Sequence, residues 1–247
     1  MSYEFYTTFT NKHHIDTLLK SFELFNELFT RTNLYISSNS LTLNSVDDKN
    51  SIFIDFSIKL EEEPKENIII CINTEYFYNI LKLINLKTIS SLDIYKNKNE
   101  NLLNICITDI SSKKIKANIE LFDTLYSRIP EFDKEDNIIT LDSKNLNNII
   151  DNFNKIKNTS SGICSIKIEN KKIKFKSLGK CSVSQELETD LIHNFNGSYS
   201  LNHLLNLHKI CSLFKEIKIY TYNSGLLNFF FEENGIQFKM YVSPMIN

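Results

Sequence analysis

The sequence contains no tryptophan, and it is poor in glycine and proline. Its 247 residues include 5 glycines and 3 prolines, which is too few for long flexible linkers, a collagen repeat or a proline-rich segment. The glycines are scattered along the chain, so they form no loop of the kind that cradles phosphate groups in nucleotide-binding folds. We therefore expect no Walker or Rossmann nucleotide site.

Long apolar runs and paired cysteines are also missing. No apolar run reaches about 18 residues and the N-terminus has no apolar signal core, so we expect an intracellular protein without a membrane span. The 5 cysteines are odd in number and none has C-x-x-C spacing, which argues against a disulfide framework and against a cysteine metal site. Buried reduced thiols in strands are the expected state.

Candidate catalytic and metal-binding groups do not cluster. His13 and His14 are adjacent, and His203 and His208 are five positions apart, a spacing that places them poorly for one metal. Asp47 and Asp48 fall in a turn, where carboxylates commonly bond the local backbone. No serine or cysteine nucleophile signature occurs. We expect no catalytic residue, no metal and no cofactor.

Four amphipathic helices and a series of antiparallel strands are predicted from the apolar periodicity. The helices are 12–29, 74–87, 143–157 and 200–211. The strands lie within 34–46, 50–60, 67–72, 90–109, 113–121, 137–141, 164–178, 180–188 and 215–242. Asn73 and Asp142 are expected to cap two of the helices, and Asn170–Lys171 to turn a hairpin.

The second half of the chain repeats the first. Ile94-Tyr95 followed by Leu102-Leu103-Asn104 matches Ile219-Tyr220 followed by Leu226-Leu227-Asn228, at a period of roughly 124–125 residues, which indicates duplicated architecture. We predict an α+β fold of two similar halves, each with an antiparallel sheet and two helices. The predicted halves are 1–118 and 137–247, and 119–136 is the connector between them.

Charge is distributed unevenly between the helices and the rest of the chain. Lysine and arginine total 28 and aspartate and glutamate total 30, which gives a net charge of −2. The predicted helices nevertheless carry 8 lysines against 5 acids, so they are positive by 3 and the remaining chain is negative by 5. Nucleic-acid binding would require this kind of sorting to one face. Ordinary solvated helix faces explain the same charges.

Five stretches, in order along the chain, resemble one known family. They are LYISSNSLTLNSVDDKNSIFIDF (34–56), INTEYFYNILKLI (72–84), IELFDTLYSRIPEF (119–132), YSLNHLLNLHKICSLFKEIKIY (199–220) and FKMYVSPMIN (238–247). The family is proliferating cell nuclear antigen (PCNA), the DNA sliding clamp. The resemblance implies three protomers that close head to tail into a homotrimeric ring, with the helices inside around double-stranded DNA of any sequence. Segments 113–121 and 177–185 match its two interface strands.

The resemblance also implies a function and a set of partners. It implies a non-enzymatic processivity factor of DNA replication and repair, which tethers DNA polymerase, the clamp loader and other proteins through short peptide motifs. It implies no cofactor and no membrane partner. The expected location is the nucleus, or a viral replication compartment or the cytoplasm if the protein is viral.

Two groups of residues are assigned to these roles by their matched positions and by the helix faces. The DNA-facing residues are Lys20, Lys82, Lys87, Lys155 and Lys209. The residues of the partner-peptide pocket are Val46, Leu125, Ile129, Pro130, Gly225, Tyr241, Ser243 and Pro244. Several inner positions where the family has lysine or arginine carry other residues here, namely Asn26, Asn79, Asn148, Asp151 and Asn202.

Two alternatives remain open at this point. The weak charge of the helix faces favours a clamp-fold protein of changed role, either a subunit of a checkpoint-type heteromeric ring or a viral transcription factor or open processivity factor. An enzyme of unrecognised type is the other alternative, because catalytic residues can be far apart in sequence.

Overall fold

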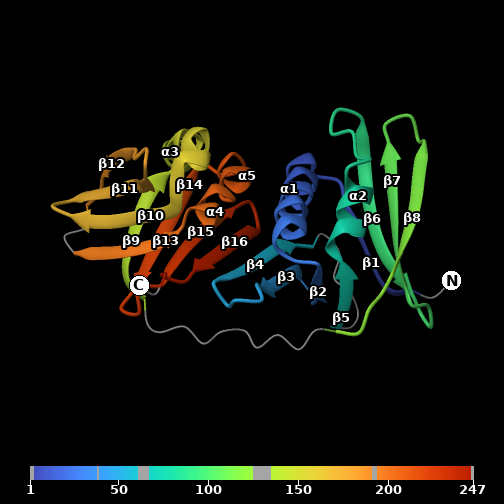
Figure 1. Cartoon of the computed structure of the whole chain (residues 1–247). Helices are drawn as coiled ribbons and strands as arrows, with labels where there is room; N and C mark the ends of the chain where they lie inside the picture. The colour runs from blue at the N-terminus through green and yellow to red at the C-terminus, as the bar shows by residue number, and fades with distance from the viewer. Residues whose placement is uncertain (1–2, 38, 61–66, 125–134, 191–193, 246–247) are drawn as a thin grey trace. The chain divides into compact units, whose positions relative to one another are not determined.

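The structure, a computed structural model, describes residues 3–37, 39–60, 67–124, 135–190 and 194–245. The chain divides into two compact units of helices and antiparallel strands (Figure 1). Unit 1 consists of Met1–Ser45 and Asp55–Arg128, and unit 2 consists of Val46–Ile54 and Ile129–Asn247. A short segment from the first half of the sequence therefore belongs to the second unit.

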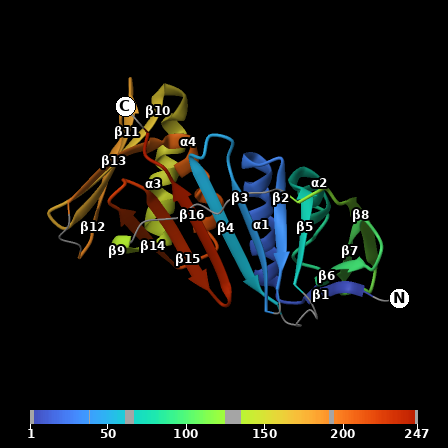
Figure 2. The ribbon, with the colours of Figure 1, turned by 90° about the horizontal axis from the view of Figure 1, so that it is seen from below.

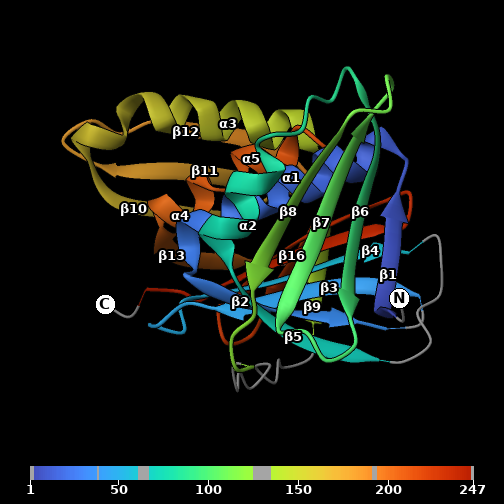
Figure 3. The same ribbon diagram turned by 90° about the vertical axis from the view of Figure 1, so that its right-hand side faces the viewer.

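Unit 1 contains two helices and two sets of strands. Its elements, in chain order, are β1 (Tyr3–Phe9), α1 (Lys12–Leu28), β2 (Arg31–Ile36), β3 (Ser40–Val46), β4 (Ile52–Lys59), β5 (Ile68–Asn73), α2 (Thr74–Leu81), β6 (Ile89–Asn97), β7 (Leu102–Asp109) and β8 (Lys114–Glu120). One sheet has the order β1-β6-β7-β8, and the other set of strands has the order β5-β2-β3-β4. Strand β8 is the last strand of its sheet, as Figure 3 shows.

Unit 2 repeats this order of elements. They are β9 (Glu135–Asp142), α3 (Ser143–Ile156), the 3₁₀ turn η1 (Lys157–Thr159), β10 (Ser160–Glu169), β11 (Lys172–Gly179), β12 (Ser184–Glu188), β13 (Phe195–Ser200), α4 (Leu201–Leu205), α5 (His208–Cys211), β14 (Glu216–Tyr222), β15 (Leu227–Glu233) and β16 (Ile236–Val242). The sheet orders β12-β11-β10-β13 and β9-β14-β15-β16 correspond to those of unit 1. The predicted α+β fold of two similar halves is confirmed.

Short-range chemistry fixes the ends of these elements. The side chain of Asn73 accepts a hydrogen bond from the backbone N–H of Tyr76 at the start of α2, and Asp142 accepts one from Lys144 at the start of α3, as predicted for N-caps. The hairpin between β10 and β11 turns at Asn170 and Lys171, which have φ angles of 51° and 60°. Two left-handed residues are what a two-residue hairpin turn requires.

The two predicted helices 74–87 and 200–211 differ from the structure. Helix α2 ends at Leu81, and the chain continues in tight turns. The second helix is split into α4 and α5, because Leu207 and Ile210 donate to carbonyls three residues earlier instead of four. Such bonds wind the chain more tightly, and they keep Leu207 and Ile210 buried.

Strands β1 and β13 were not predicted. In β1 the buried face consists of Phe5, Thr7 and Phe9, so the apolar alternation is interrupted by a threonine. In β13 the glycine at 197 makes room for a buried tyrosine, since a Cβ at Gly197 would lie 2.3 Å from Tyr199 Oη. Neither segment has the continuous apolar alternation that indicates a strand in sequence.

The cysteines are all free thiols. Cys71, Cys106 and Cys164 are buried in strands, as predicted, and burial raises the pKa of Cys164 to about 12. The prediction of strand positions was wrong for Cys211, which is buried in α5, and for Cys181, which is exposed outside any strand. None of the helices in the described ranges is long and apolar enough to cross a membrane.

Candidate functional sites

The predicted DNA-facing lysines of unit 1 lie on or after its two helices. Lys20 is in α1 and forms an ion pair with Asp16 one turn earlier, at 3.5 Å. Lys82 is the C-cap of α2, and its Nζ lies 5.4 Å from the centre of the Tyr78 ring. Lys87 lies beyond the end of α2, so the prediction that it belongs to this helix was wrong. Lys82 and Lys87 are exposed, and Lys20 is partly exposed.

The predicted lysines of unit 2 lie on α3 and α5. Lys155 is exposed in the last turn of α3 and donates to Asn152 Oδ1 at 3.2 Å, and Lys209 is partly exposed in α5. The two helices also carry a polar contact that the sequence did not indicate. His208 Nδ1 lies 2.9 Å from Asp151 Oδ1 and 3.0 Å from Asn147 Oδ1. The helix surface of unit 2 is therefore mixed in charge.

Five of the predicted peptide-pocket residues lie in the described part of unit 2. Strand β3 ends at Val46, and Gly225 is in the turn between β14 and β15. Tyr241 lies near the end of β16, and Ser243 and Pro244 follow that strand. Leu125, Ile129 and Pro130 lie outside the described residues, as does most of the predicted connector 119–136. The geometry of the site is thus defined by three separate segments of the chain.

Hydrogen bonds and ring contacts hold these three segments together. The backbone N–H of Ser243 donates to the Ser51 carbonyl at 2.9 Å, and the Tyr241 ring centre lies 5.6 Å from that of Phe53. Gly225 has a φ of 81°, and a Cβ there would lie 3.3 Å from Pro244 Cγ. Glycine is favoured at this position because other residues are strained at this φ.

The buried hydroxyl of Tyr199 fixes the same glycine turn. It donates to the Gly225 carbonyl at 2.6 Å. One residue earlier in the same strand, the backbone carbonyl of Ser198 accepts a hydrogen bond from the backbone N–H of Met245 at 2.8 Å. Burial of the Tyr199 hydroxyl raises its pKa far above that of an exposed tyrosine, so it remains a donor at any physiological pH.

The turn that carries Ser51 is organised by Asp47. Its carboxylate accepts hydrogen bonds from the backbone N–H and the hydroxyl of Ser51, both at 2.6 Å, and from the backbone N–H of Ile52 at 2.9 Å. Partial burial raises the pKa of Asp47, but these hydrogen bonds outweigh burial and lower it below 3.8. The predicted turn role of Asp47 is confirmed, and the turn presents Ser51 to Ser243.

Replacing Asp47 by alanine should therefore destabilise unit 2. We expect a loss of about 1–2 kcal/mol in the free energy of unfolding at pH 7, which is typical for removing a carboxylate that caps backbone N–H groups. Since the pKa is lowered in the folded state, the contribution is present above the ordinary aspartate pKa and is lost as the pH falls through the folded value. Urea unfolding of wild type and variant at several pH values measures both effects.

Asp48→Ala is the matched control for this prediction. Asp48 is exposed and takes part in none of the hydrogen bonds or ion pairs of the described residues. We expect a change within about 0.5 kcal/mol, as for most surface substitutions. Equal destabilisation by Asp48→Ala and Asp47→Ala would contradict the role of the Asp47 carboxylate.

Two strands lie at the ends of their sheets. Strand β8 lies within the predicted interface segment 113–121, whereas the predicted segment 177–185 begins at the end of β11 and overlaps β12 only at Ser184 and Gln185. Strand β8 pairs only with β7 in its sheet, and β12 pairs only with β11. Strand β8 carries Lys114, Lys116 and Ile115, which is 44% exposed, whereas β12 carries Glu186 and Glu188. An exposed edge strand can add a strand from another chain.

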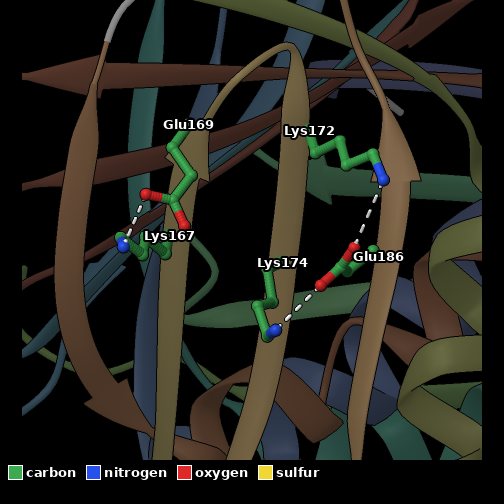
Figure 4. A network of polar contacts seen from close by, with 5 residues as sticks. All are labelled: Lys167, Glu169, Lys172, Lys174 and Glu186. Carbon is green, nitrogen blue, oxygen red and sulfur yellow. Dashed lines mark hydrogen bonds and ion pairs between the residues drawn. The ribbon is translucent and has the colours of Figure 1, made fainter.

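The face of the sheet next to β12 is a polar network (Figure 4). Glu186 Oε1 accepts from Lys174 at 2.8 Å, and its other oxygen lies 3.7 Å from Lys172. Lys167 and Glu169 form a further pair at 2.6 Å. The hydrogen bond from Lys174 lowers the pKa of Glu186. All of these side chains are substantially exposed, so the network contributes little to stability.

A contact within the predicted connector 119–136 was not predicted. The guanidinium of Arg31 lies 4.1 Å from the centre of the Phe122 ring, and the backbone N–H of Phe122 donates to the Cys71 carbonyl. The composition contained a signal for a specific role of Arg31, because it is one of only two arginines among 28 lysines and arginines. A planar guanidinium stacks on an aromatic ring in a way that lysine cannot reproduce.

No group of three or more histidine, cysteine, aspartate or glutamate side chains in the described ranges is arranged to hold a metal ion. His203 is partly buried beside the Asp47 turn, and this burial lowers its pKa.

Comparison with known proteins gives structural but not sequence relatives. No known family profile and no curated protein matches the sequence. Among solved structures, a proliferating cellular nuclear antigen from Entamoeba histolytica superposes with a TM-score of 0.84 at 18% identity, over 99% of this chain and 100% of that one. A PCNA2–PCNA3 complex from Sulfolobus tokodaii gives 0.83 at 16% identity, over 97% and 98%. The chain has the PCNA clamp fold.

Proposed function

We propose that this protein is a DNA sliding clamp. Three copies close head to tail into a ring around duplex DNA, and the ring tethers DNA polymerase and other replication and repair proteins. The observation that carries the proposal is the duplicated clamp fold, which matches PCNA structures over nearly the whole chain. A ring of this kind acts by topology, so its function requires no catalytic group.

The two edge strands support assembly of the chain with itself. Strand β8 presents Lys114 and Lys116 together with Glu120, and β12 presents Glu186 and Glu188. Strand β8 lies in the first segment matched to the family's interface, and β12 overlaps the second only at Ser184 and Gln185. Opposite charges on two edges of one chain favour a heterologous, head-to-tail contact, and such contacts generate rings when the rotation closes. Repulsion between two copies of β8 disfavours the head-to-head arrangement.

The modest charge of the helices is compatible with sliding. A clamp that is held by closure needs only a weak, sequence-independent attraction to phosphate groups. Lys82 and Lys155 are exposed and take part in no ion pair of the described residues, whereas Lys20 is paired with Asp16. We therefore expect weak, salt-sensitive binding to DNA and retention that depends on ring closure.

Retention on end-blocked DNA tests this function without a clamp loader. A linear duplex is tethered to a bead by one end, the protein threads over the free end, and that end is then blocked with streptavidin. We expect the protein to remain bound through a wash at 1 M salt, where screening leaves little electrostatic attraction, and to be released when the duplex is cut. Its mass in solution should be about three times 28.9 kDa.

Loss of the protein in the salt wash despite blocked ends would contradict sliding. A second candidate function would then apply, in which the chain is one subunit of a heteromeric ring. The mixed charge of the unit 2 helices, with Asp151 and His208 in contact, favours this candidate. It predicts a monomer at all concentrations, and a stoichiometric complex only with a second clamp-like chain.

A further inference from the structure

Three tyrosine side chains gather on one face of the sheet β1-β6-β7-β8 in unit 1. Tyr6 on β1 is paired across the strands with Tyr95 on β6, and the two strands lie next to each other near the N-terminus (Figure 2). The ring centres of Tyr3 and Tyr6 are 5.3 Å apart, those of Tyr3 and Tyr95 are 5.3 Å apart, and those of Tyr6 and Tyr95 are 6.1 Å apart. We call these three residues the tyrosine cluster.

The tyrosine cluster lies on the solvent side of its sheet. Phe5 and Ile94, which are neighbours of the cluster along the strands, are buried on the opposite face, as the two-residue alternation of a strand requires. Tyr3 is 44% exposed, and Tyr6 and Tyr95 are partly exposed. The face of an aromatic ring is electrostatically negative, so an exposed group of rings attracts a cation.

A carboxylate is held beside the tyrosine cluster. Asp93 lies two residues before Tyr95 on β6, and its Oδ1 accepts hydrogen bonds from the Tyr6 hydroxyl at 3.2 Å and the Thr8 hydroxyl at 2.9 Å. Because the Tyr6 hydroxyl reaches the next cross-strand pair, its ring lies along the surface of the sheet. Asp93 forms no ion pair with any described residue, and its Oδ2 accepts no hydrogen bond from them.

The charged residues nearby do not neutralise Asp93. The charged side chains of β1, β6 and β7 are Glu4, Asp93, Lys96 and Asp109. Glu4 and Lys96 form an ion pair with each other, and Asp109 accepts hydrogen bonds within the turn after β7. On β8, Lys116 is paired with Cys106, which is paired with Asp93, so the width of β7 separates this lysine from the carboxylate. The turn between β6 and β7 carries one charge of each sign, Lys98 and Glu100.

Arginine combines the two contacts that this surface offers. Its planar guanidinium stacks on aromatic rings and also donates two parallel hydrogen bonds to a carboxylate, whereas the lysine ammonium is a point charge. Partial burial is the main cause that raises the pKa of Tyr95, and the negative charges of Asp93 and Glu100 raise it further, as expected where a cation is attracted. The chain itself contains one such stack, since the Arg31 guanidinium lies 4.1 Å from the centre of the Phe122 ring.

We propose that the tyrosine cluster and Asp93 bind an arginine side chain of a partner protein. The guanidinium stacks on the rings and donates to the Asp93 carboxylate. This inference goes beyond the proposed function, because the surface includes none of the residues proposed to contact DNA or a partner peptide. It lies on the face of the sheet opposite the buried side chains of unit 1, and it selects partners by arginine rather than by an apolar anchor.

Labelled peptides test this inference with the full-length protein. One peptide carries two arginines in a glycine–serine sequence. Matched peptides carry lysine, or citrulline, which keeps the shape of arginine without its charge. In fluorescence anisotropy at 50 mM salt, we expect the arginine peptide to bind about fivefold more tightly than the lysine peptide. The citrulline peptide should show no binding.

Two variants of the surface should weaken this binding. Asp93→Asn should lower the affinity for the arginine peptide about tenfold, because the amide oxygen still accepts from Tyr6 and Thr8 but carries no charge. Tyr3→Ala should lower it about fivefold through loss of the stacked ring. Since Tyr3 is half exposed and Asp93→Asn is isosteric, both proteins should fold like wild type, which circular dichroism checks.

The matched controls are Asp48→Asn and Tyr76→Ala. They remove one exposed carboxylate and one 54% exposed ring from other surfaces, and both should bind the arginine peptide like wild type.

Three outcomes would overturn the inference. Equal affinity for the arginine and lysine peptides would show attraction by charge alone. Binding that survives both Asp93→Asn and Tyr3→Ala would place the peptide on another surface, and no binding of the arginine peptide to wild type would leave the tyrosine cluster without this ligand. None of these outcomes affects the proposed clamp function, because solution mass and retention on DNA are measured separately.

Discussion

Ile115→Glu should convert the proposed trimer into a monomer of 28.9 kDa. Ile115 is 44% exposed in the middle of the edge strand β8, between Lys114 and Lys116. In the proposed ring its side chain becomes covered by the neighbouring protomer, and a glutamate there is a buried carboxylate without a partner. Such a group costs about 1–3 kcal/mol or more at each interface, and a closed trimer has three interfaces.

The measurement is sedimentation equilibrium or light scattering at micromolar protein. Ile69→Glu is the control, since Ile69 is 53% exposed on β5, outside the proposed interface strands. It introduces the same group on another strand of unit 1, and it should remain trimeric. Both variants should remain folded, because both side chains are already about half exposed. A trimeric Ile115→Glu protein would exclude β8 from the interface.

Replacing Lys20, Lys82, Lys155 and Lys209 together by alanine should abolish threading onto the tethered DNA at low salt, so that little protein is trapped when the free end is blocked. Each ring loses twelve positive charges, four from each of three protomers. Phosphate contacts release counterions, so fewer contacts lower the affinity and flatten its dependence on salt. The folded state should change little, because exposed lysine-to-alanine changes in helices are nearly neutral and the Lys20–Asp16 surface pair is worth about 0–1 kcal/mol.

A matched set of lysines separates position from net charge. Lys167, Lys172, Lys174 and Lys176 lie on β10 and β11, on the polar face shown in part in Figure 4. Replacing these four by alanine removes the same charge from each protomer. This variant should thread and slide like wild type. If both quadruple variants fail equally, the effect is one of overall charge, and the helix lysines have no special role.

The elements that sequence analysis predicted are those with strong local periodicity. Helix α3 was predicted almost to the residue, because its apolar stripe is regular and Asp142 caps it. The duplication was predicted from the similarity of the segments that include Ile94 and Ile219, and the structure places these segments in the equivalent strands β6 and β14. In both cases the signal lies within a short stretch of sequence. The confirmed fold followed from these elements together with the family resemblance.

Features that depend on contacts between distant residues were not predicted. Strand β13 depends on Tyr199 packing over Gly197. The pair of Asp151 and His208 joins α3 to α5, and the contact of Arg31 with Phe122 spans 91 positions of the sequence. A local sequence pattern cannot predict such pairs, because each of the residues alone is compatible with an exposed position. The predicted sites depended on the resemblance for the same reason.

The placement of Val46–Ile54 in unit 2 has a consequence for how the chain folds. Unit 2 combines this segment with Ile129–Asn247, and the Ser243–Ser51 hydrogen bond joins its two parts across 192 positions. During synthesis the segment must wait until β16 has been made. Closing so long a loop is slow, since its entropy must be lost before contacts compensate for it. A fragment that begins at residue 129 lacks one part of its own unit, so cutting the chain at the connector should not yield two independently stable halves.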